Sequence, residues 1–391
     1  MKVVLRGDLA SPSGYSAHAR ALVQSLIKVP GIEVGIEHVK QSQGTLPLPP
    51  EEQQLYAEMM NRSWDKPDVR INFLTPPYYM FQKGVYTIGF TMWETTNICD
   101  REVQGQRGWN WVGQMNQCDE IWTGCASSVE AFARSGLQVT ANVIPGPVDT
   151  DLYKPDLPEL NIPEVTIMTD GIEISKDQRP KSIGFIGDWN ARKNIDGWLG
   201  VIISQFVLKP VVGILKTRLP GDIDQHRALQ ALVSKRRAEL RLGSRRPMIC
   251  LIPEILSDGD IARLYSSMDC YMSLSRGEGL DLPTLQAMAC GVPVIHTNFG
   301  ATKDYLTPET GFPIQYTYTI VEGMKHGPYF SDMWWAEPDL HSATRVLADL
   351  LTSIESDPGA LSDLLACARK RVQDFHSIPA ITSLLVERLD V

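Results

Sequence analysis

The chain has 391 residues, 43% hydrophobic and 21% charged, a globular composition that predicts two domains of roughly 150–200 residues each. Its net charge of −9 argues against a constitutively basic nucleic-acid surface and against a polybasic membrane anchor. Seven cysteines without a CxxC pair indicate reduced thiols in the cytoplasm rather than a disulfide framework or a zinc site.

The N-terminal stretch has the pattern of a β-loop-α-β unit. A strand over 2–6 precedes a Gly/Pro/Ser loop over 7–14, a helix over 15–28 and a strand over 32–38. Gly14 lets the backbone come close to a ligand, and the helix N-terminus behind it can face a phosphate. His18, on the same helix, lies in the stretch that we place at the ligand site. An ordinary βα turn is the alternative interpretation of this loop.

Neither a signal peptide nor a membrane span is expected. The chain begins directly with a strand, which is not the pattern of a secretory leader. No apolar run reaches the roughly 18 residues that suggest a transmembrane helix.

A second candidate ligand-facing pair follows the strand over 85–90. Trp93 and Glu94 come directly after it, at what becomes the carboxyl end of a parallel strand, where α/β sheets bind ligands. A packed Trp beside a solvated Glu is the alternative. Strands and helices continue to alternate as far as Asp149, and this alternation predicts a doubly wound parallel sheet.

The second half repeats the same theme. Residues 154–181 are rich in Pro, Asp and Glu, which suits a crossing between domains. A strand over 182–187 then leads to a polar loop with Arg192 and Lys193, and Asn194 can cap the helix that follows. Two cations beside a helix N-terminus can neutralise a diphosphate. The alternative interpretation is that Arg192 and Lys193 are solvated surface residues without a ligand.

Residues 271–295 give the most specific signal. A short strand and a polar loop are followed by Pro283, which suits a first helical turn, and by Gly291, which suits a helix exit. Glu278 lies on the loop, and Gln286 lies eight positions later on the first turns of the helix. Both side chains can face the hydroxyls of one ligand.

This stretch resembles a known signature. EGLDLPTLQAMACGVPV at 278–294 is similar to E-G-F-G-L-P-x-L-E-A-M-A-x-G-x-P-V of the retaining, sugar-nucleotide-dependent glycosyltransferases of the family-4 type, glycosyl transferases group 1. Two departures fall at functional positions, where Asp281 replaces a Gly and Gln286 replaces a Glu. An amide cannot form the charge-assisted hydrogen bonds of a carboxylate.

The resemblance implies the α/β GT-B architecture, with two Rossmann-like, doubly wound domains facing across a cleft. Residues 1–165 would form the acceptor-side domain, with 376–391 crossing back onto it, and residues 180–375 would bind the nucleotide sugar. Trp334 and Trp335 precede the last helices, and they either stack on a sugar or pack at a domain edge.

The resemblance also implies roles for individual residues. Glu278 would support the transferred sugar, and Arg192 and Lys193 would hold the diphosphate, so these three are the expected catalytic residues. The expected donor-binding residues are Gly14, His18, Trp93, Glu94, Gly279, Leu280, Asp281, Leu282 and Gln286. No His, Asp and Glu cluster with ligand spacing stands out, so neither a metal nor a cofactor is expected beyond the donor.

The expected activity is a retaining, metal-independent transfer of a sugar from a nucleoside diphosphate sugar to an acceptor hydroxyl. The acceptor class stays open between a glycan, a small molecule, a protein and a modified nucleic-acid base, and nucleic acid enters only as an acceptor. Two alternatives remain: a non-catalytic nucleotide-sugar-binding protein, suggested by Asp281 and Gln286, and a GT-B sugar-nucleotide epimerase.

Overall fold

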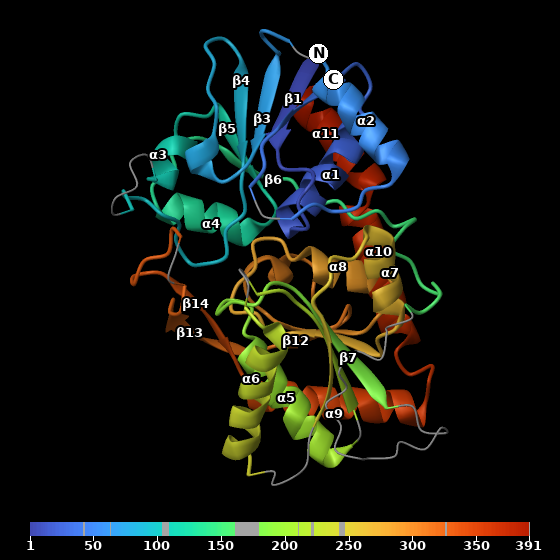
Figure 1. Cartoon of the computed structure of the whole chain (residues 1–391). Helices are drawn as coiled ribbons and strands as arrows, with labels where there is room; N and C mark the ends of the chain where they lie inside the picture. Colours follow the sequence, from blue (N-terminus) through green and yellow to red (C-terminus); the bar gives the residue numbers. More distant parts are fainter. Residues whose placement is uncertain are drawn as a thin grey trace.

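The computed structural model describes residues 1–41, 44–62, 64–103, 109–160, 180–209, 211–219, 223–241, 247–324 and 327–390. Most of the expected interdomain crossing over 154–181 therefore lies outside the described residues. Two α/β domains are stacked one above the other, the N-terminal domain uppermost in Figure 1.

The N-terminal domain is built on a parallel sheet with the strand order β2-β1-β3-β4-β5-β6. Its strands are β1 (Lys2–Gly7), β2 (Glu33–His38), β3 (Val69–Phe73), β4 (Tyr86–Phe90), β5 (Glu120–Thr123) and β6 (Ala141–Val143). Its helices are α1 (Gly14–Leu26), α2 (Pro50–Met60), the 3-10 turn η1 (Pro76–Tyr78), α3 (Trp111–Met115) and α4 (Ala126–Arg134). Since successive strands run outward in both directions from β1, the sheet is doubly wound, as expected.

The C-terminal domain has a second parallel sheet, with the order β12-β11-β10-β7-β8-β9. Its strands are β7 (Lys181–Ile186), β8 (Val211–Lys216), β9 (Met248–Ile252), β10 (Cys270–Ser273), β11 (Val294–Thr297) and β12 (Phe312–Ile314). Its helices are α5 (Ile195–Leu208), α6 (Gln225–Glu239), α7 (Asp258–Ser266), α8 (Leu282–Ala289), the 3-10 turn η2 (Gly300–Asp304), α9 (Leu340–Ser356) and α10 (Ser362–His376).

Local sequence sets the ends of the helices that border the site. Ser13 caps α1 by accepting a hydrogen bond from the backbone N–H of Ser16 at 3.2 Å. Asn194 caps α5, where its side chain accepts from Gly197 N–H at 3.2 Å. Pro283 lies in the first turn of α8, and Gly291 ends this helix with φ +72°. These four termini lie within about one residue of the positions that the sequence predicts.

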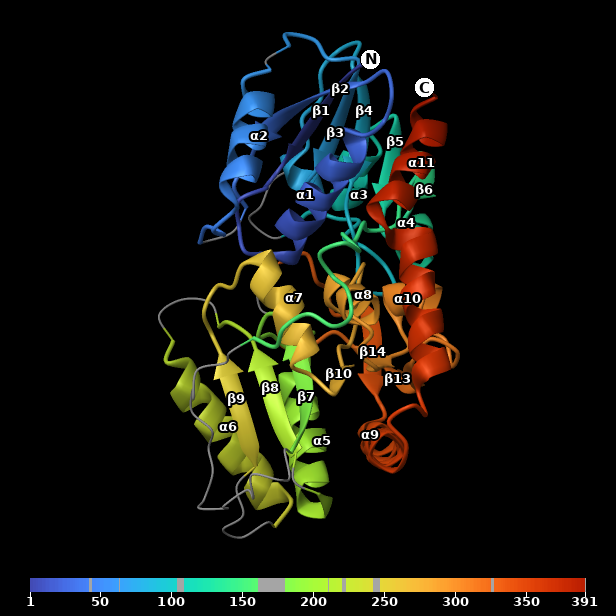
Figure 2. The same cartoon turned by 90° about the vertical axis from the view of Figure 1, so that its right-hand side faces the viewer.

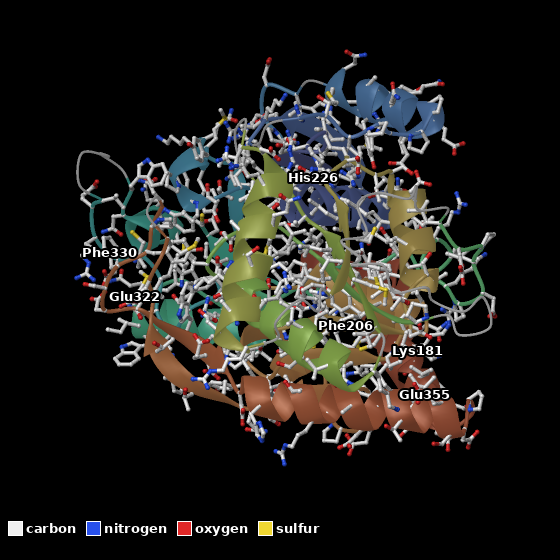
Figure 3. All side chains as sticks on the ribbon, turned by 60° about the horizontal axis from the view of Figure 1, so that its bottom comes forward. Lys181, Phe206, His226, Glu322, Phe330 and Glu355 are labelled. Atoms are coloured by element: carbon white, nitrogen blue, oxygen red, sulfur yellow. The ribbon has the colours of Figure 1, made fainter. Side chains whose placement is uncertain are left out.

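An antiparallel hairpin, β13 (Tyr316–Ile320) and β14 (Trp334–Pro338), extends from the C-terminal domain toward the N-terminal one. Trp334 and Trp335 are consecutive strand residues, so they point to opposite faces. Trp335 is buried, whereas Trp334 is 44% exposed. The pair therefore does not form one stacking platform. Phe330, labelled in Figure 3, lies on the loop before β14, and the Arg101 guanidinium of the N-terminal domain lies 4.5 Å from its ring centroid.

The last helix, α11 (Ile378–Leu389), returns to the N-terminal domain, as Figure 2 shows. It packs against α1, where Thr382 Oγ1 donates to Ser25 O at 3.1 Å. Arg388 pairs with Glu120 of β5 at 3.4 Å. Within the described part of the chain, no helix has the length and apolarity needed to cross a membrane.

Candidate active site

The strand order of the C-terminal sheet defines where its loops diverge. Successive strands run from β7 through β8 to β9 on one side, and from β10 through β11 to β12 on the other. The switch point therefore lies between β7 and β10, and such points bind ligands in open α/β sheets. The loop after β7 carries Arg192 and Lys193, and the loop after β10 carries Glu278.

Glu278 accepts hydrogen bonds from both cations of the β7 loop. Lys193 Nζ lies 2.7 Å from Oε1, and Arg192 Nη1 lies 2.8 Å from Oε2. Glu278 is 3% exposed and Lys193 is 7% exposed. Burial alone would raise the pKa of the Glu278 carboxyl, but the two cations outweigh it and lower this pKa to about 2. The carboxylate is therefore charged, and the three expected catalytic residues form one buried cluster.

Glu94 joins this cluster from the N-terminal domain. Its Oε1 lies 3.2 Å from Arg192 Nε, and Tyr329 donates its hydroxyl to the same carboxylate. Burial lowers the pKa of Arg192, but Glu278 and Glu94 raise it further, so the net shift is upward. This contact places Glu94 beside the three expected catalytic residues. Tyr329 was missed, because it lies far along the chain in a loop without a recognisable pattern.

The signature loop lies directly against the segment that carries Glu94. A Cβ on Gly277 would lie 2.1 Å from Glu94 O, and a Cβ on Gly279 would lie 2.7 Å from Trp93 N. No side chain fits at either position, so Gly279 brings the two domains together. Leu280 has a similar role, because a Cβ on Gly146 of the N-terminal domain would lie 2.4 Å from its Cδ2.

Trp93 is buried next to the site and packs against Tyr329. It is 3% exposed, and its ring stacks on that of Tyr329 with centroids 5.4 Å apart. Its Nε1 donates to Thr95 Oγ1 and to Asn97 O, both at 2.7 Å. The structure thus places Trp93 as packing beneath Glu94 and Tyr329 rather than as a residue that faces a ligand.

His18 is a correction to the expected site. The residue is fully buried, and its ring packs edge-on against Phe73 and Phe90, with centroids 4.8 and 5.2 Å away. Neither ring nitrogen has a hydrogen-bond partner in the described part of the chain. Burial, with a smaller contribution from His376, lowers the pKa of His18 to about 3, so the ring is neutral. It belongs to the core because it lies on the same helix face as Leu22.

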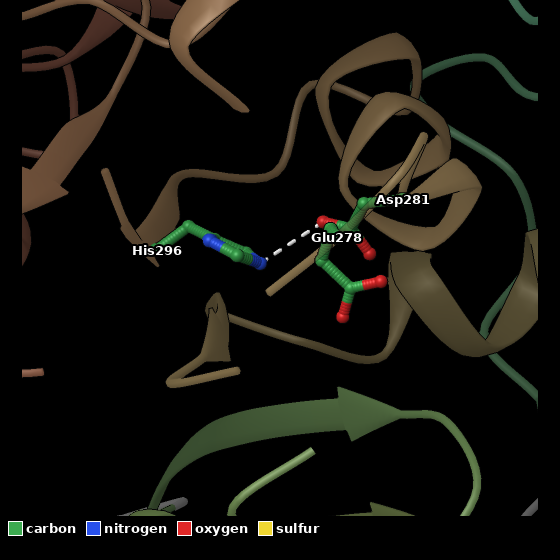
Figure 4. Close-up of side chains that lie close together, drawn as sticks. All are labelled: Glu278, Asp281 and His296. Carbon is green, nitrogen blue, oxygen red and sulfur yellow. Dashed lines mark ion pairs between the residues drawn. The ribbon is translucent and has the colours of Figure 1, made fainter. Parts of the chain in front are cut away.

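Asp281 forms a buried ion pair with His296, at the end of β11. Asp281 has φ +64°, and its Oδ2 lies 3.0 Å from His296 Nε2 (Figure 4). His296 Nδ1 lies 2.8 Å from Thr297 O, a carbonyl that can only accept, so Nδ1 carries a hydrogen. Burial lowers the pKa of His296, but Asp281 raises it further, and the net shift is upward. The upward shift favours the protonated ring.

Glu278, Asp281 and His296 together have the ligand types of a metal site, since one atom of each lies within 4.8 Å of the others. This cluster is not visible in the sequence spacing. His296 approaches Glu278 and Asp281 only because β11 pairs with β10, the strand before their loop. A metal does not fit the bonding, however. Lys193 and Arg192 already occupy the Glu278 oxygens. The raised pKa of His296 favours the protonated ring, which has no free lone pair for a metal.

Replacing His296 by glutamine is expected to destabilise the protein in a pH-dependent way. The raised pKa means that the ion pair stabilises the fold fully below pH 6.5 and that this contribution is lost as pH rises through the folded-state pKa. Leaving Asp281 unpaired should cost about 2 kcal/mol near pH 6 and less near pH 9, as measured by urea unfolding. The exposed His341→Gln is the control. An equal loss at both pH values would contradict the charged pair.

Gln286 and Leu282 lie farther along α8, on the wall of an interdomain cavity of about 350 Å³. Gln286 Oε1 accepts from Tyr265 at 3.2 Å. Arg20 and Asp258 line the same cavity and pair across the two domains at 2.8 Å. Gln286 therefore faces open space, but neither Glu278 nor its two cations line this cavity, so the structure does not place Gln286 and Glu278 in the same cavity.

Gly14 is the first residue of α1 and has free space around it. A Cβ at this position would meet no atom within 4 Å. The open space is compatible with a ligand, but crowding does not require a glycine here.

Two facing, doubly wound domains that close on a buried cation and carboxylate cluster at a switch point define the GT-B class of glycosyltransferase folds. Residues 180–322, which lie in the C-terminal domain, match the family model of glycosyl transferases group 1. This confirms the resemblance that the signature suggests.

A curated relative supports the family. The lipopolysaccharide core biosynthesis mannosyltransferase LpsB of Rhizobium meliloti (strain 1021) is 28% identical over 182 residues. The match covers 46% of this chain and 47% of LpsB, so it spans about half of each protein.

Solved structures support the fold over the whole chain. HepE from Anabaena, in complex with UDP and glucose, superposes with a TM-score of 0.64 at 15% identity and covers 100% of this chain and 99% of its own. Sucrose-phosphate synthase from Thermosynechococcus elongatus gives a TM-score of 0.63 at 15% identity, with coverages of 100% and 98%. Both confirm the GT-B arrangement.

Proposed function

We propose that this protein is a retaining, metal-independent glycosyltransferase that moves a sugar from a nucleoside diphosphate sugar to an acceptor hydroxyl. The buried contact of Glu278 with Lys193 and Arg192 carries the proposal, because it unites an anion and two cations at the switch point. The cations would stabilise the leaving diphosphate, and Glu278 would support the positive charge that develops on the sugar. No organic cofactor is needed for this chemistry.

The acceptor hydroxyl would attack the anomeric carbon as the bond to the diphosphate breaks, and the departing phosphate would take the hydroxyl proton. Retention and metal independence rest on the family resemblance and on the pairing of the Glu278 oxygens with protein cations. Seven free cysteines, six of them buried, are consistent with our placement of the protein in the cytoplasm.

A panel of UDP, GDP, ADP and TDP sugars tests the proposal through thermal stability and hydrolysis, on the wild type and on Lys193→Ala. Ligand at about a hundred times its Kd should stabilise the wild type by roughly 2.7 kcal/mol. One donor should bind and be slowly hydrolysed, and the variant should lose hydrolysis. EDTA should leave turnover unchanged if no metal takes part.

Three outcomes would contradict the proposal. Binding of a donor without turnover in any acceptor mixture would favour the non-catalytic nucleotide-sugar-binding protein, for which Gln286 and Asp281 are the motivating departures. Conversion of the donor into an epimer would favour an epimerase. If no sugar nucleotide binds, the site assignment itself is wrong.

A further inference from the structure

The interdomain cavity of about 350 Å³ lies where the chain crosses between the two domains, and we call it the hinge cavity. Its walls come from α1 and α2 of the N-terminal domain and from α7 and α8 of the C-terminal domain, which lie below them in Figure 2. The first crossing contributes Val148 and the second contributes Ile378. These crossings are joined, because Val148 N–H donates to His376 O at 2.6 Å. A volume of this order is typical of small-molecule sites.

Polar groups of both domains meet on the wall of the hinge cavity. Arg20 of α1 pairs with Asp258 of α7 at 2.8 Å, and the Arg20 side chain is only 6% exposed. Burial raises the pKa of Glu52 on α2, Tyr56 and Arg20 lower it, and Asp258 raises it, so Glu52 lies near this pair. The charged lining residues are the cation Arg20 and the carboxylates Glu51, Glu52, Asp149 and Asp258. Their excess of negative charge repels an anionic ligand.

The Tyr153 hydroxyl is a polar group without a partner on the same wall. Tyr153 is 5% exposed, and its ring packs edge-on against that of Tyr265 with centroids 6.3 Å apart. In the part of the chain that the structure describes, this hydroxyl makes no hydrogen bond. Burial raises the pKa of Tyr153 well above its usual value, Asp258 adds to the rise and Arg20 opposes it, so a protonated phenol lies near their ion pair. A ligand in the cavity can supply the missing hydrogen bond.

Apolar side chains cover much of the remaining wall. Val148, Leu282 and Ile378 are 2%, 6% and 7% exposed, and Leu55 lies beside them. A neutral sugar ring matches such a mixed surface, because its hydroxyl groups can donate to carboxylates while its C–H groups pack against apolar side chains. The hinge cavity therefore suits a neutral ring with several hydroxyl groups better than it suits a phosphate.

We propose that the hinge cavity binds a neutral, polyhydroxylated ring of monosaccharide size, such as one sugar unit of a glycan, through Tyr153, Glu52 and Asp258. This site goes beyond the proposed function, because neither Glu278 nor its two cations line the cavity. A ligand here contacts α1 and α2 on one side and α7 on the other. Its binding therefore also favours the present arrangement of the two domains.

Ligand-observed NMR titration of the full-length protein tests the site with the methyl α-pyranosides of glucose, mannose and galactose. At least one should bind with a Kd on the order of 1 mM, and glucose 6-phosphate should bind about tenfold more weakly because the carboxylates repel it. Tyr153→Phe should weaken glycoside binding about tenfold without lowering the thermal midpoint, because its hydroxyl has no partner to lose. Glu52→Gln should reduce the discrimination against glucose 6-phosphate. Tyr86→Phe, at a 47% exposed position of β4, is the control with no expected effect.

The nucleoside of the donor is the competing occupant, because Leu282 and Gln286 also line the hinge cavity. Displacement of the glycoside by uridine or adenosine would overturn the proposal. So would absence of glycoside binding to the wild type, or an affinity of Tyr153→Phe within about twofold of the wild type. Glycoside binding without turnover of any sugar nucleotide would support this site and contradict the proposed transferase. Turnover of a donor without glycoside binding would overturn this site alone.

Discussion

Glu278→Ala is expected to lower sugar transfer by about 10²–10³-fold, the cost typical of removing one preorganised electrostatic group. The same change should destabilise the protein by about 3–5 kcal/mol, because it leaves the 7% exposed Lys193 as a buried charge without its partner. Single-turnover hydrolysis of the donor and urea unfolding measure the two effects separately.

The pH dependence of stability gives a second check on Glu278. Its pKa is 4.5 ordinarily and about 2 in the fold, so its stabilising contribution is present above pH 4.5 and is lost as pH falls toward 2. In Glu278→Ala, the free energy of unfolding should therefore fall less than in the wild type as pH drops from 4.5 toward 2.

Glu37→Ala is the matched control for Glu278. This carboxylate of β2 also pairs with two cations, Arg70 at 2.9 Å and Arg6 at 3.5 Å, but on the other domain and away from the switch point. The control should lose stability and keep its turnover number. Glu278→Gln keeps the shape and removes the charge, so turnover by this variant within about tenfold of the wild type would contradict the electrostatic role.

His18→Leu is expected to reduce the loss of folding stability that the wild type undergoes at mildly acidic pH. The unfolded chain protonates this histidine near pH 6.5, whereas the folded protein resists protonation until about pH 3, so stability falls as pH falls between these values. Each pH unit is worth about 1.4 kcal/mol, which gives about 5 kcal/mol over the whole range and about 2 kcal/mol at pH 5.

Urea unfolding at pH 7.5 and pH 5 measures this effect. The variant should match the wild type at pH 7.5, because an apolar side chain replaces a buried ring without hydrogen-bond partners among the described residues. At pH 5 it should be the more stable protein. His341→Leu, at an exposed position of α9, is the control. A wild-type stability that does not change between the two pH values would refute the buried neutral histidine.

The parts of the fold that local sequence encodes were predictable. Pro283 and Gly291 fix the ends of α8 through backbone constraints that hold in any context. The sequence predicts that Arg192, Lys193 and Glu278 lie close together, because the carboxyl ends of parallel strands meet at one edge of a sheet.

Long-range side-chain contacts were not predictable in the same way. His296 lies near the end of the buried strand β11, and the local sequence gives no sign that Asp281 will lie beside it and raise its pKa. Tyr329 reaches Glu94 only because a loop folds back between the domains. The misplacement of His18 was avoidable, because helical periodicity already groups it with the buried Leu22.

The return of α11 makes the N-terminal domain discontinuous in sequence, with the whole C-terminal domain inserted into it. During synthesis, residues of the first domain leave the ribosome early, but the helix that packs against α1 follows only after the C-terminal domain has been made. Until then, the side of α1 that contacts Leu385 and Ile381 stays uncovered. The order of translation therefore places the docking of α11 on α1 after the synthesis of the C-terminal domain.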